Sequence, residues 1–239
     1  MAIAAMVEEG SLLADIGTDH GYLPIWLLEE KRIPSAIAVD VQKGPLLRAK
    51  SHVEERGLSS LVDLRLGDGL SVLSPGEADA AVLAGMGGPL MARILKEGQK
   101  TAETFRYLVL SPQSDLFSFR HYLLTNGYRI LDEDMVFDEG KYYTVIKAAP
   151  SRQGRGEEKG ERPWDYIEKA YGRYLLQSGK PVVLRFLKKE KEKYEAIKEG
   201  LFLAKGGRAE ERLSQVEREL LALEKAIATA KVAEDKDGQ

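Results

Sequence analysis

The sequence predicts an α/β fold with a mostly parallel sheet, followed by a helical appendage. Up to Ala149, short apolar runs alternate with amphipathic stretches at the rhythm of βαβ units. A stretch without apolar residues follows, and beyond it apolar residues recur at intervals of three and four. The chain has 239 residues, of which 44% are apolar, so it is long enough to bury a substantial core.

Each element of the first part is assigned from its apolar period and from the Gly, Pro and Asp residues that bound it. The last two strands, joined by Asp138-Glu139-Gly140, form a hairpin and place an antiparallel pair at the end of the parallel sheet. The predicted strands are Ser11 to Ile16, Ala36 to Val41, Asp63 to Leu66, Ala78 to Ala84, Tyr107 to Leu110, Tyr128 to Phe137 and Lys141 to Ala148. The predicted connecting helices are Tyr22 to Lys31, Gly44 to Arg56, Pro89 to Lys100 and Asp115 to Thr125, with a short turn at Leu70 to Leu73.

The second part of the chain is predicted to be helical. Residues 150–162, which include SRQGRGEEKGER, read as a linker between a domain at 1–149 and a helical hairpin domain at 163–239. The predicted helices are Trp164 to Leu176, Pro181 to Ala204 and Ala209 to Val232. In the last of them Leu213, Val216, Leu220, Leu223 and Ile227 form one apolar seam, so the two long helices are expected to pair as an antiparallel coiled coil.

Composition narrows the classes of protein. The chain has no cysteine, which excludes a disulfide framework and a thiolate zinc site. No apolar run approaches the roughly 20 residues of a membrane span, and MAIAAMVEEG is too short and acidic for a signal peptide, so we expect a cytoplasmic protein. His20, His52 and His121 lie far apart without metal-ligand spacing, so no metal is expected, and only His20 is predicted to be functional.

The charge of the chain is distributed unevenly. The net charge is −3 overall, but residues 1–149 carry 15 Lys and Arg against 21 Asp and Glu, a net charge of −6. Residues 150–239 carry the remaining 20 against 17, a net charge of +3. A polyanionic partner is therefore expected to meet the second part of the chain.

The turn DIGTDHGYL follows the first predicted strand, where open parallel sheets bind ligands. Gly17 and Gly21 can adopt positive φ and let a ligand approach the backbone. Their G-x-x-x-G spacing matches neither the dinucleotide fingerprint nor the phosphate loop. The carboxylate of Asp19 would repel a phosphate and attract an ammonium or a sulfonium group.

Two further acids follow the next two predicted strands. Asp40 is placed to accept both hydroxyls of a ribose. Asp68, between two glycines, is placed to accept from an exocyclic amine such as that of adenine. Ribose, adenine and a cationic amino-acid end together describe S-adenosylmethionine. Each acid alone also fits a helix cap or a turn, but three in register favour the ligand site.

Two loops after later strands complete the predicted site. Ala84-Gly85-Met86-Gly87-Gly88-Pro89 is interpreted as the lip of the pocket where the methyl group is transferred, although a tight strand-to-helix turn also fits. Ser111, Pro112 and Gln113 are candidates to contact the edge of an acceptor base, with a polar loop as the alternative.

These residues resemble a specific family, the bacterial tRNA adenine-N1-methyltransferases that modify position 22 of tRNA, known as TrmK. The chain departs from the family at Ser111-Pro112-Gln113, where Gln-Pro-Asn is usual. Only ten residues precede the first predicted strand, so the family's N-terminal helix is expected to be shortened or missing. The matching stretches are ADIGTDHGYLPIWL (14–27), AVDVQKGPLLRA (38–49), RLGDGL (65–70), AGMGGPLMARIL (84–95) and NGYRI with DEGKYY (126–143).

The resemblance implies a Rossmann-like class I methyltransferase sheet, with a coiled-coil appendage, that uses S-adenosyl-L-methionine to methylate adenine N1 in tRNA. Asp19 is the candidate to stabilise the cationic product and His20 to orient the loop or the base. The candidates to hold RNA are Lys188, Lys189, Lys205 and Arg208, with Lys191 and Lys193. The alternative is a solvated charged face, which the interspersed Glu190, Glu192 and Glu195 also fit. The predicted cofactor-binding residues are Asp15, Gly17, Thr18, Gly21, Asp40, Val41, Asp68, Gly69, Ala84, Gly85, Met86 and Gly87.

Two other functions stay open at this point. A nicotinamide-dependent oxidoreductase suits the βαβ pattern and Asp40 but lacks G-x-G-x-x-G. A non-catalytic RNA-binding protein on a degenerate methyltransferase fold is opposed by the intact set of Asp15, Asp40 and Asp68. A monomer is expected, with a coiled-coil dimer as the alternative.

Overall fold

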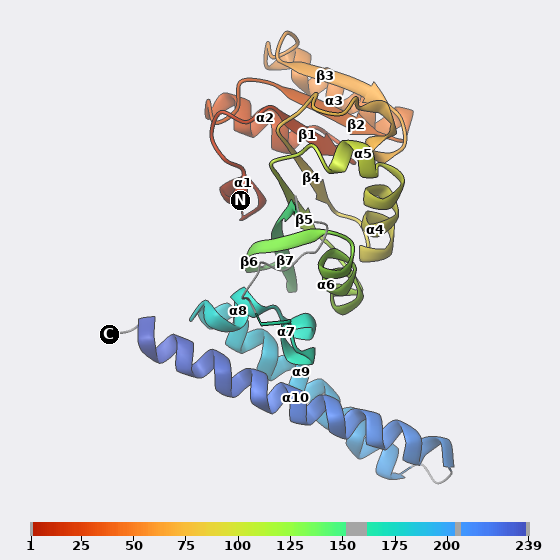
Figure 1. Ribbon diagram of the computed structural model, residues 1–239, viewed down its shortest axis with the longest axis vertical. Helices are drawn as coiled ribbons and strands as arrows, with labels where there is room; N and C mark the ends of the chain where they lie inside the picture. The colour runs from red at the N-terminus through yellow and green to blue at the C-terminus, as the bar shows by residue number, and fades with distance from the viewer. Residues whose placement is uncertain (1, 152–161, 204–206, 238–239) are drawn as a thin grey trace. The chain divides into compact units, whose positions relative to one another are not determined.

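The computed structural model describes residues 2–151, 162–203 and 207–237 (Figure 1). Within these ranges no helix is both long enough and apolar enough to cross a membrane. The first part contains α1 (Ala2–Met6), β1 (Leu13–Ile16), α2 (Tyr22–Glu29), β2 (Ala36–Asp40), α3 (Lys43–Glu55), β3 (Val62–Leu66), η1 (Gly69–Val72), β4 (Ala80–Ala84), α4 (Gly88–Glu97), α5 (Gln99–Ala102), β5 (Tyr107–Ser111), α6 (Leu116–Thr125), β6 (Tyr128–Asp138) and β7 (Lys141–Pro150). The second part contains α7 (Tyr166–Tyr171), α8 (Arg173–Gln177), α9 (Pro181–Leu203) and α10 (Gly207–Asp237).

The seven strands form one sheet in the order β3-β2-β1-β4-β5-β7-β6. Strands β1 to β5 pair in parallel, and β7 runs antiparallel to β5. This confirms the predicted Rossmann-like sheet with an antiparallel pair at its end. The strand order reverses at β1, which has β2 on one side and β4 on the other. Such a switch point opens a crevice at the carboxyl ends of the two strands.

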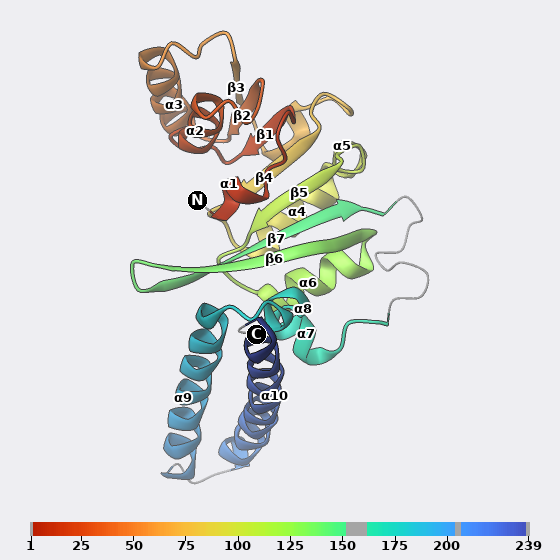
Figure 2. The same ribbon diagram turned by 90° about the vertical axis from the view of Figure 1, so that its left-hand side faces the viewer.

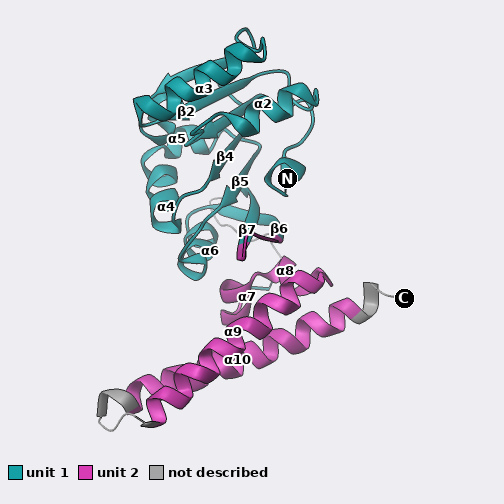
Figure 3. Ribbon diagram, turned by 180° about the vertical axis from the view of Figure 1, so that it is seen from behind, with its two compact units in different colours: residues 1–134, 143–163 teal, residues 135–142, 164–239 magenta. Residues whose placement is uncertain are grey.

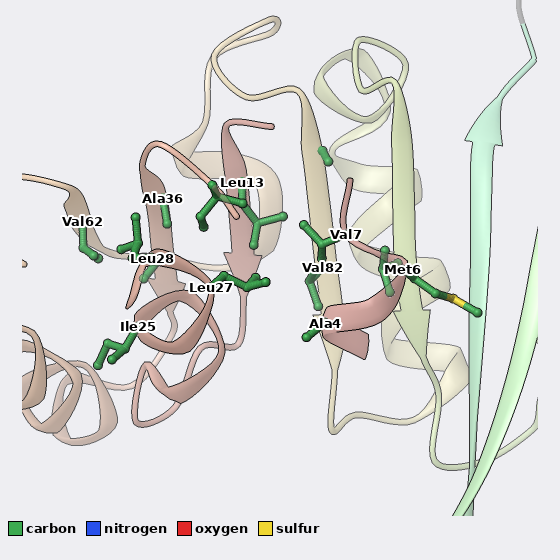
Figure 4. Close-up of a cluster of buried hydrophobic side chains, with 14 of the residues drawn as sticks. Ala4, Met6, Val7, Leu13, Ile25, Leu27, Leu28, Ala36, Val62 and Val82 are labelled. Carbon is green, nitrogen blue, oxygen red and sulfur yellow. The ribbon is translucent and has the colours of Figure 1, made fainter. Parts of the chain in front are cut away.

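Helices cover both faces of the sheet, with α1, α2 and α3 on one face and α4 and α6 on the other (Figure 2). Because both faces of the central strands are buried, β1, β4 and β5 are mostly apolar, and β1 and β5 have no exposed residue. The edge strands β3 and β6 carry exposed polar residues. On the first face, Leu13, Leu27 and Val82 belong to one buried cluster that joins α1 and α2 to the strands (Figure 4).

The N-terminal helix was expected to be shortened or missing. It is present as α1, a single short helix of 5 residues, so the expectation that it is missing is wrong. Its side chains Ala4 and Met6 are buried against the sheet (Figure 4). The Arg32 guanidinium donates to the backbone oxygens of Ala4, at 2.9 Å, and Val7, at 2.8 Å. A planar, always charged group thereby satisfies carbonyls at the end of the helix. The anchor could not be predicted because Arg32 lies about 25 residues away in sequence.

Two predicted helices are each divided in two by a glycine. The stretch Pro89 to Lys100 becomes α4 and α5, separated at Gly98, where an added β-carbon would lie 2.5 Å from Leu70 Cβ. The close approach of η1 therefore requires glycine here. The stretch Trp164 to Leu176 becomes α7 and α8, separated at Gly172, whose φ is 88°.

The chain forms two compact units (Figure 3). One comprises residues 1–134 and 143–163, and the other comprises residues 135–142 and 164–239, so the tip of the β6–β7 hairpin belongs with the helices. Most of the predicted linker, 152–161, lies outside the described residues. Within the second unit α9 and α10 lie side by side (Figures 1 and 2), and Val216, Leu223 and Ala226 are fully buried in their apolar seam.

Candidate functional site

The turn between β1 and α2 is built by left-handed residues. Gly17 and Gly21 have φ of 77° and 71°, and Asp19 has φ of 52°, a conformation that aspartate tolerates better than most residues. The amides of Gly17 and Thr18 both donate to Val39 O, at 2.8 and 2.9 Å. The turn is thereby fixed to the end of β2, which presents Asp19 at the surface beside the crevice.

Asp15 lies beneath this turn at the end of β1 and is only 5% exposed. Its Oδ2 accepts a hydrogen bond of 2.7 Å from Thr18 Oγ1. Burial raises the pKa of Asp15 from 3.8 to about 6; the Thr18 bond opposes the shift and the charge of Asp40 adds to it. Asp15 therefore changes protonation near neutral pH, unlike an ordinary surface carboxylate.

This shift predicts a pH-dependent stability. Because the pKa is higher in the folded than in the unfolded chain, the folded protein holds the extra proton between pH 3.8 and about 6. Stability should therefore fall as pH rises through this window, by at most about 3 kcal/mol. Urea denaturation of the wild type and Asp15→Asn across pH 4 to 8 should show the difference between their unfolding free energies falling toward high pH. A constant difference would contradict the assignment.

Asp40, at the end of β2, is held by two backbone donors. Its Oδ2 accepts from the Asp19 amide at 3.0 Å and its Oδ1 from the Gln42 amide at 2.8 Å. A carboxylate has about four acceptor sites, so two remain for the hydroxyls of a ribose. The adjacent Val41 side chain is 62% exposed and offers an apolar surface to a flat ring.

Asp68 follows β3, and its carboxylate is half exposed. Arg93 of α4, which was not predicted to take part, lies 3.2 Å from Asp68 Oδ2. The flanking glycines have a packing role, because an added β-carbon would lie 2.1 Å from Val72 at Gly67 and 2.9 Å from Ile94 at Gly69. The structure therefore leaves Asp68 accessible, with a cation beside it that was not predicted.

The loop after β4 meets the β1 turn through Met86. A β-carbon added at Gly17 would lie 2.9 Å from the flexible end of Met86, at Cε, and the φ of 77° at Gly17 favours glycine independently of this contact. Gly85 has a φ of 73° and open space around it. Gly87 is packed against Ser114, because a β-carbon added at Gly87 would lie 2.9 Å from Ser114 Oγ. Both interpretations of the glycine-rich loop therefore hold in part. One part of the loop borders the crevice, and the other part forms a tight strand-to-helix turn.

The loop after β5 differs from its prediction. Ser111 and Pro112 are buried, and Ser111 Oγ donates to Thr144 O at 3.1 Å. The Ser111 hydroxyl is therefore engaged within the protein and not presented to a base. Gln113 is exposed, and its backbone N–H donates to the backbone oxygen of Met86 at 3.0 Å. This hydrogen bond joins the loop to the one after β4.

Two of the three histidines lie together, so the expectation that all are far apart is wrong. His52 Nδ1 lies 2.9 Å from His20 O, and the two rings are 5.8 Å apart between centroids. Tyr22 stacks with both rings, at 5.3 and 5.2 Å. His52 could not have been found from local sequence, because the fold of α3 beside the β1 turn brings it there.

The predicted RNA-binding residues belong to the second unit. Lys188 and Lys189 are exposed on α9, and Lys189 Nζ lies 5.6 Å from the centroid of the Tyr142 ring. Lys205 and the side chain of Arg208 lie outside the described part of the chain.

Neighbouring glutamates engage two further lysines of α9. Lys191 Nζ lies 3.0 Å from Glu224 Oε1, and Lys193 Nζ lies 3.4 Å from Glu190 Oε2. These exposed ion pairs fit the solvated-face reading for these two positions. An RNA-binding role would then depend chiefly on Lys188 and Lys189.

Comparison with known proteins agrees with this geometry. The methyltransferase domain family matches residues 1–146. The tRNA (adenine(22)-N(1))-methyltransferase of Bacillus subtilis is 38% identical over 189 residues, which are 79% of this chain and 73% of that protein.

Two solved structures cover nearly the whole chain. The B. subtilis M1A22 tRNA methyltransferase TrmK is 31% identical, with a TM-score of 0.81 over 95% of this chain and 96% of that one. A Streptococcus pneumoniae protein in complex with S-adenosyl-L-methionine is 29% identical, with the same TM-score and coverage. The chain therefore belongs to the methyltransferase domain family and, within it, to the family of tRNA (adenine(22)-N1)-methyltransferases.

Proposed function

We propose that the protein transfers a methyl group from S-adenosylmethionine to N1 of an adenine in tRNA, at position 22. The observation that carries this proposal is the placing of Asp15, Asp40 and Asp68 at the ends of three adjacent parallel strands, around the turn at Gly17. Three acids at this edge suit a cationic nucleoside and oppose a phosphate-rich cofactor. The family of the chain supports the same function.

The residues of this edge fit the cofactor. Gly17, with a φ of 77°, exposes its backbone at this edge without a side chain. Asp40 keeps two acceptor positions for the ribose hydroxyls, and Asp68 can accept from the adenine amine. The remaining cofactor residues are proposed to be Asp15, Thr18, Gly21, Val41, Gly69, Ala84, Gly85, Met86 and Gly87.

When bound, the cofactor supplies the methyl carbon: the N1 lone pair forms the new C–N bond, the C–S bond breaks with its electron pair passing to sulfur, and the positive charge moves to the base. Adenine N1 carries no proton, so the chain needs no general base. Its residues act by position. Asp19, fixed by its amide to Asp40, places a carboxylate near the developing charge. His20, with Nε2 3.5 Å from Asp19 Oδ2, restrains that carboxylate.

The substrate is proposed to be a folded tRNA. N1 lies on the Watson–Crick edge, so the base must leave its stack before attack. Backbone contacts must meanwhile hold the rest of the RNA, and Lys188 and Lys189 on the helical domain are proposed to contribute. Gln113 is the one exposed residue of the three predicted base contacts. The proposal also includes a methyltransferase domain at 1–149 and a helical domain at 163–239. It further includes a cytoplasmic location.

The test is methyl transfer from radiolabelled S-adenosylmethionine to unmodified tRNA, followed by nucleoside analysis. The wild type should yield 1-methyladenosine, and a tRNA with guanosine at position 22 should yield none. Asp19→Asn should lower kcat about tenfold, because an exposed carboxylate is partly screened by solvent. Asparagine is the matched variant, since it also tolerates positive φ.

Other outcomes would select another function. Binding of tRNA without methyl transfer would favour a non-catalytic RNA-binding protein. Binding of a nicotinamide cofactor in preference to S-adenosylmethionine would favour an oxidoreductase. Transfer to a base other than adenine would refute the proposed acceptor atom while retaining the cofactor.

A further inference from the structure

A cavity of about 550 Å³ adjoins the β1 turn, and most of its lining residues have no role in the site described so far. Three of its lining residues, Asp15, Gly17 and Thr18, belong to the cofactor turn, and Ala84 belongs to the end of β4. Its volume is within the range of small-ligand pockets. A ligand in this cavity would therefore lie next to the reacting end of the crevice.

The opposite wall is apolar and aromatic. It is formed by Tyr22, Leu23, Ile25 and Trp26 of α2 together with Ile3 and Ala4 of α1, and the ion pair of Glu29 and Arg56 also lines the cavity. Such a wall suits a flat, mostly apolar group, and the Arg56 guanidinium is already paired with Glu29 at 2.5 Å, which weakens its attraction for a phosphate. The N-terminal helix thus closes the cavity on one side, which assigns it a place in ligand binding.

Tyr22 differs from the rest of this wall in its exposure and in its ring contacts. Its side chain is 65% exposed, although aromatic rings gain most from burial. The rings of Tyr22, His20 and His52 are nearly parallel, with interplanar angles of 12° to 22°. Because all three centroid distances lie between 5.2 and 5.8 Å, the rings form a compact triangular patch and not a column.

The patch contains one buried polar atom whose hydrogen bond is not made within the described part of the protein. His20 Nδ1 is buried and has no hydrogen-bond partner among the described residues. A buried polar atom without a partner is rare in a completed core and calls for a water or a ligand. An exposed ring held by two stacked neighbours is already ordered, so stacking a base on it costs little conformational entropy.

We propose that this cavity receives the adenine that is methylated, and that Tyr22 stacks against the extruded base. The inference rests on the proposed function, because an adenine removed from its helix needs a surface to replace the stacking it has lost. The shared wall at Gly17 and Ala84 would then hold the base beside the methyl group. Tyr22 would set both the position of the acceptor and a preference for a planar base.

The test compares Tyr22→Ala with Tyr22→Phe. Loss of one base–aromatic stack is expected to lower kcat/KM for tRNA by about 5- to 150-fold, the equivalent of 1–3 kcal/mol. Phenylalanine, which keeps the ring, should remain within about threefold of the wild type. The affinity for S-adenosylmethionine, measured by calorimetry, and the thermal unfolding midpoint should not change in either variant, since the side chain is exposed.

A matched control is Leu12→Ala, which removes another exposed apolar side chain at the other end of β1. The control should retain wild-type kcat/KM. Unchanged kcat/KM in Tyr22→Ala, or equal losses in Tyr22→Ala and Tyr22→Phe, would overturn the stacking role. Weakened cofactor binding in Tyr22→Ala would assign the ring to the cofactor instead. A wild type that transfers no methyl group would refute the proposed function itself, which distinguishes the two failures.

Discussion

Asp40→Asn is expected to lower the affinity for S-adenosylmethionine by about 100-fold. The carboxylate accepts from the amides of Asp19 and Gln42 and, in the proposed site, from two ribose hydroxyls. An asparagine has one acceptor oxygen, and its NH₂ group would face a donor. Each hydrogen bond to a charged group contributes about 1.5–3 kcal/mol, so loss of two accounts for at least a factor of 100.

Calorimetric titration of the cofactor measures this effect directly. Asp63→Asn is the matched control, because it makes the same change at the opposite end of the adjacent strand β3. The control should bind the cofactor as the wild type does. Binding by Asp40→Asn within threefold of the wild type would show that Asp40 orders the β1 turn without contacting the cofactor.

Arg120→Met is expected to destabilise the first unit by about 3–5 kcal/mol. Arg120 on α6 and Glu133 on β6 form an ion pair of 2.7 Å between Nε and Oε1, and their side chains are 1% and 0% exposed. Removing the guanidinium takes the Arg120 charge away from a carboxylate that stays buried. A decrease of this size corresponds to roughly 6–20 °C in the unfolding midpoint of a domain of this length.

Thermal unfolding followed by circular dichroism provides the measurement. The double variant Arg120→Met/Glu133→Leu should recover much of the loss, because it removes both charges and keeps an apolar volume. Arg56→Met, which breaks the exposed pair with Glu29, should unfold near the wild-type midpoint. A single variant as stable as the wild type would mean that water reaches Glu133. Two separate transitions would not contradict the prediction, since the chain has two compact units.

The fold could be read largely from periodicity, because strands buried on both faces are continuous apolar runs and the amphipathic helices are long. The errors lie where a distant segment intervenes. Gly98 ends α4 because Leu70 packs against it, and β1 begins at Leu13 because pairing with Ala36 and Ala80 starts there. Neither neighbour is close in sequence.

The class of sheet, the turn at Gly17 and the acids near the ends of the first three strands could be predicted from the sequence before the structure was known, since each depends on local residue type and spacing. The tertiary structure alone decided which side chains meet. In the folded chain Arg93 forms an ion pair with Asp68, and the Ser111 hydroxyl donates a hydrogen bond to the backbone oxygen of Thr144. The rings of His52 and Tyr22 lie side by side. The physical reason is that a strand end fixes where a turn occurs, whereas the partners of a side chain depend on packing between segments tens of residues apart.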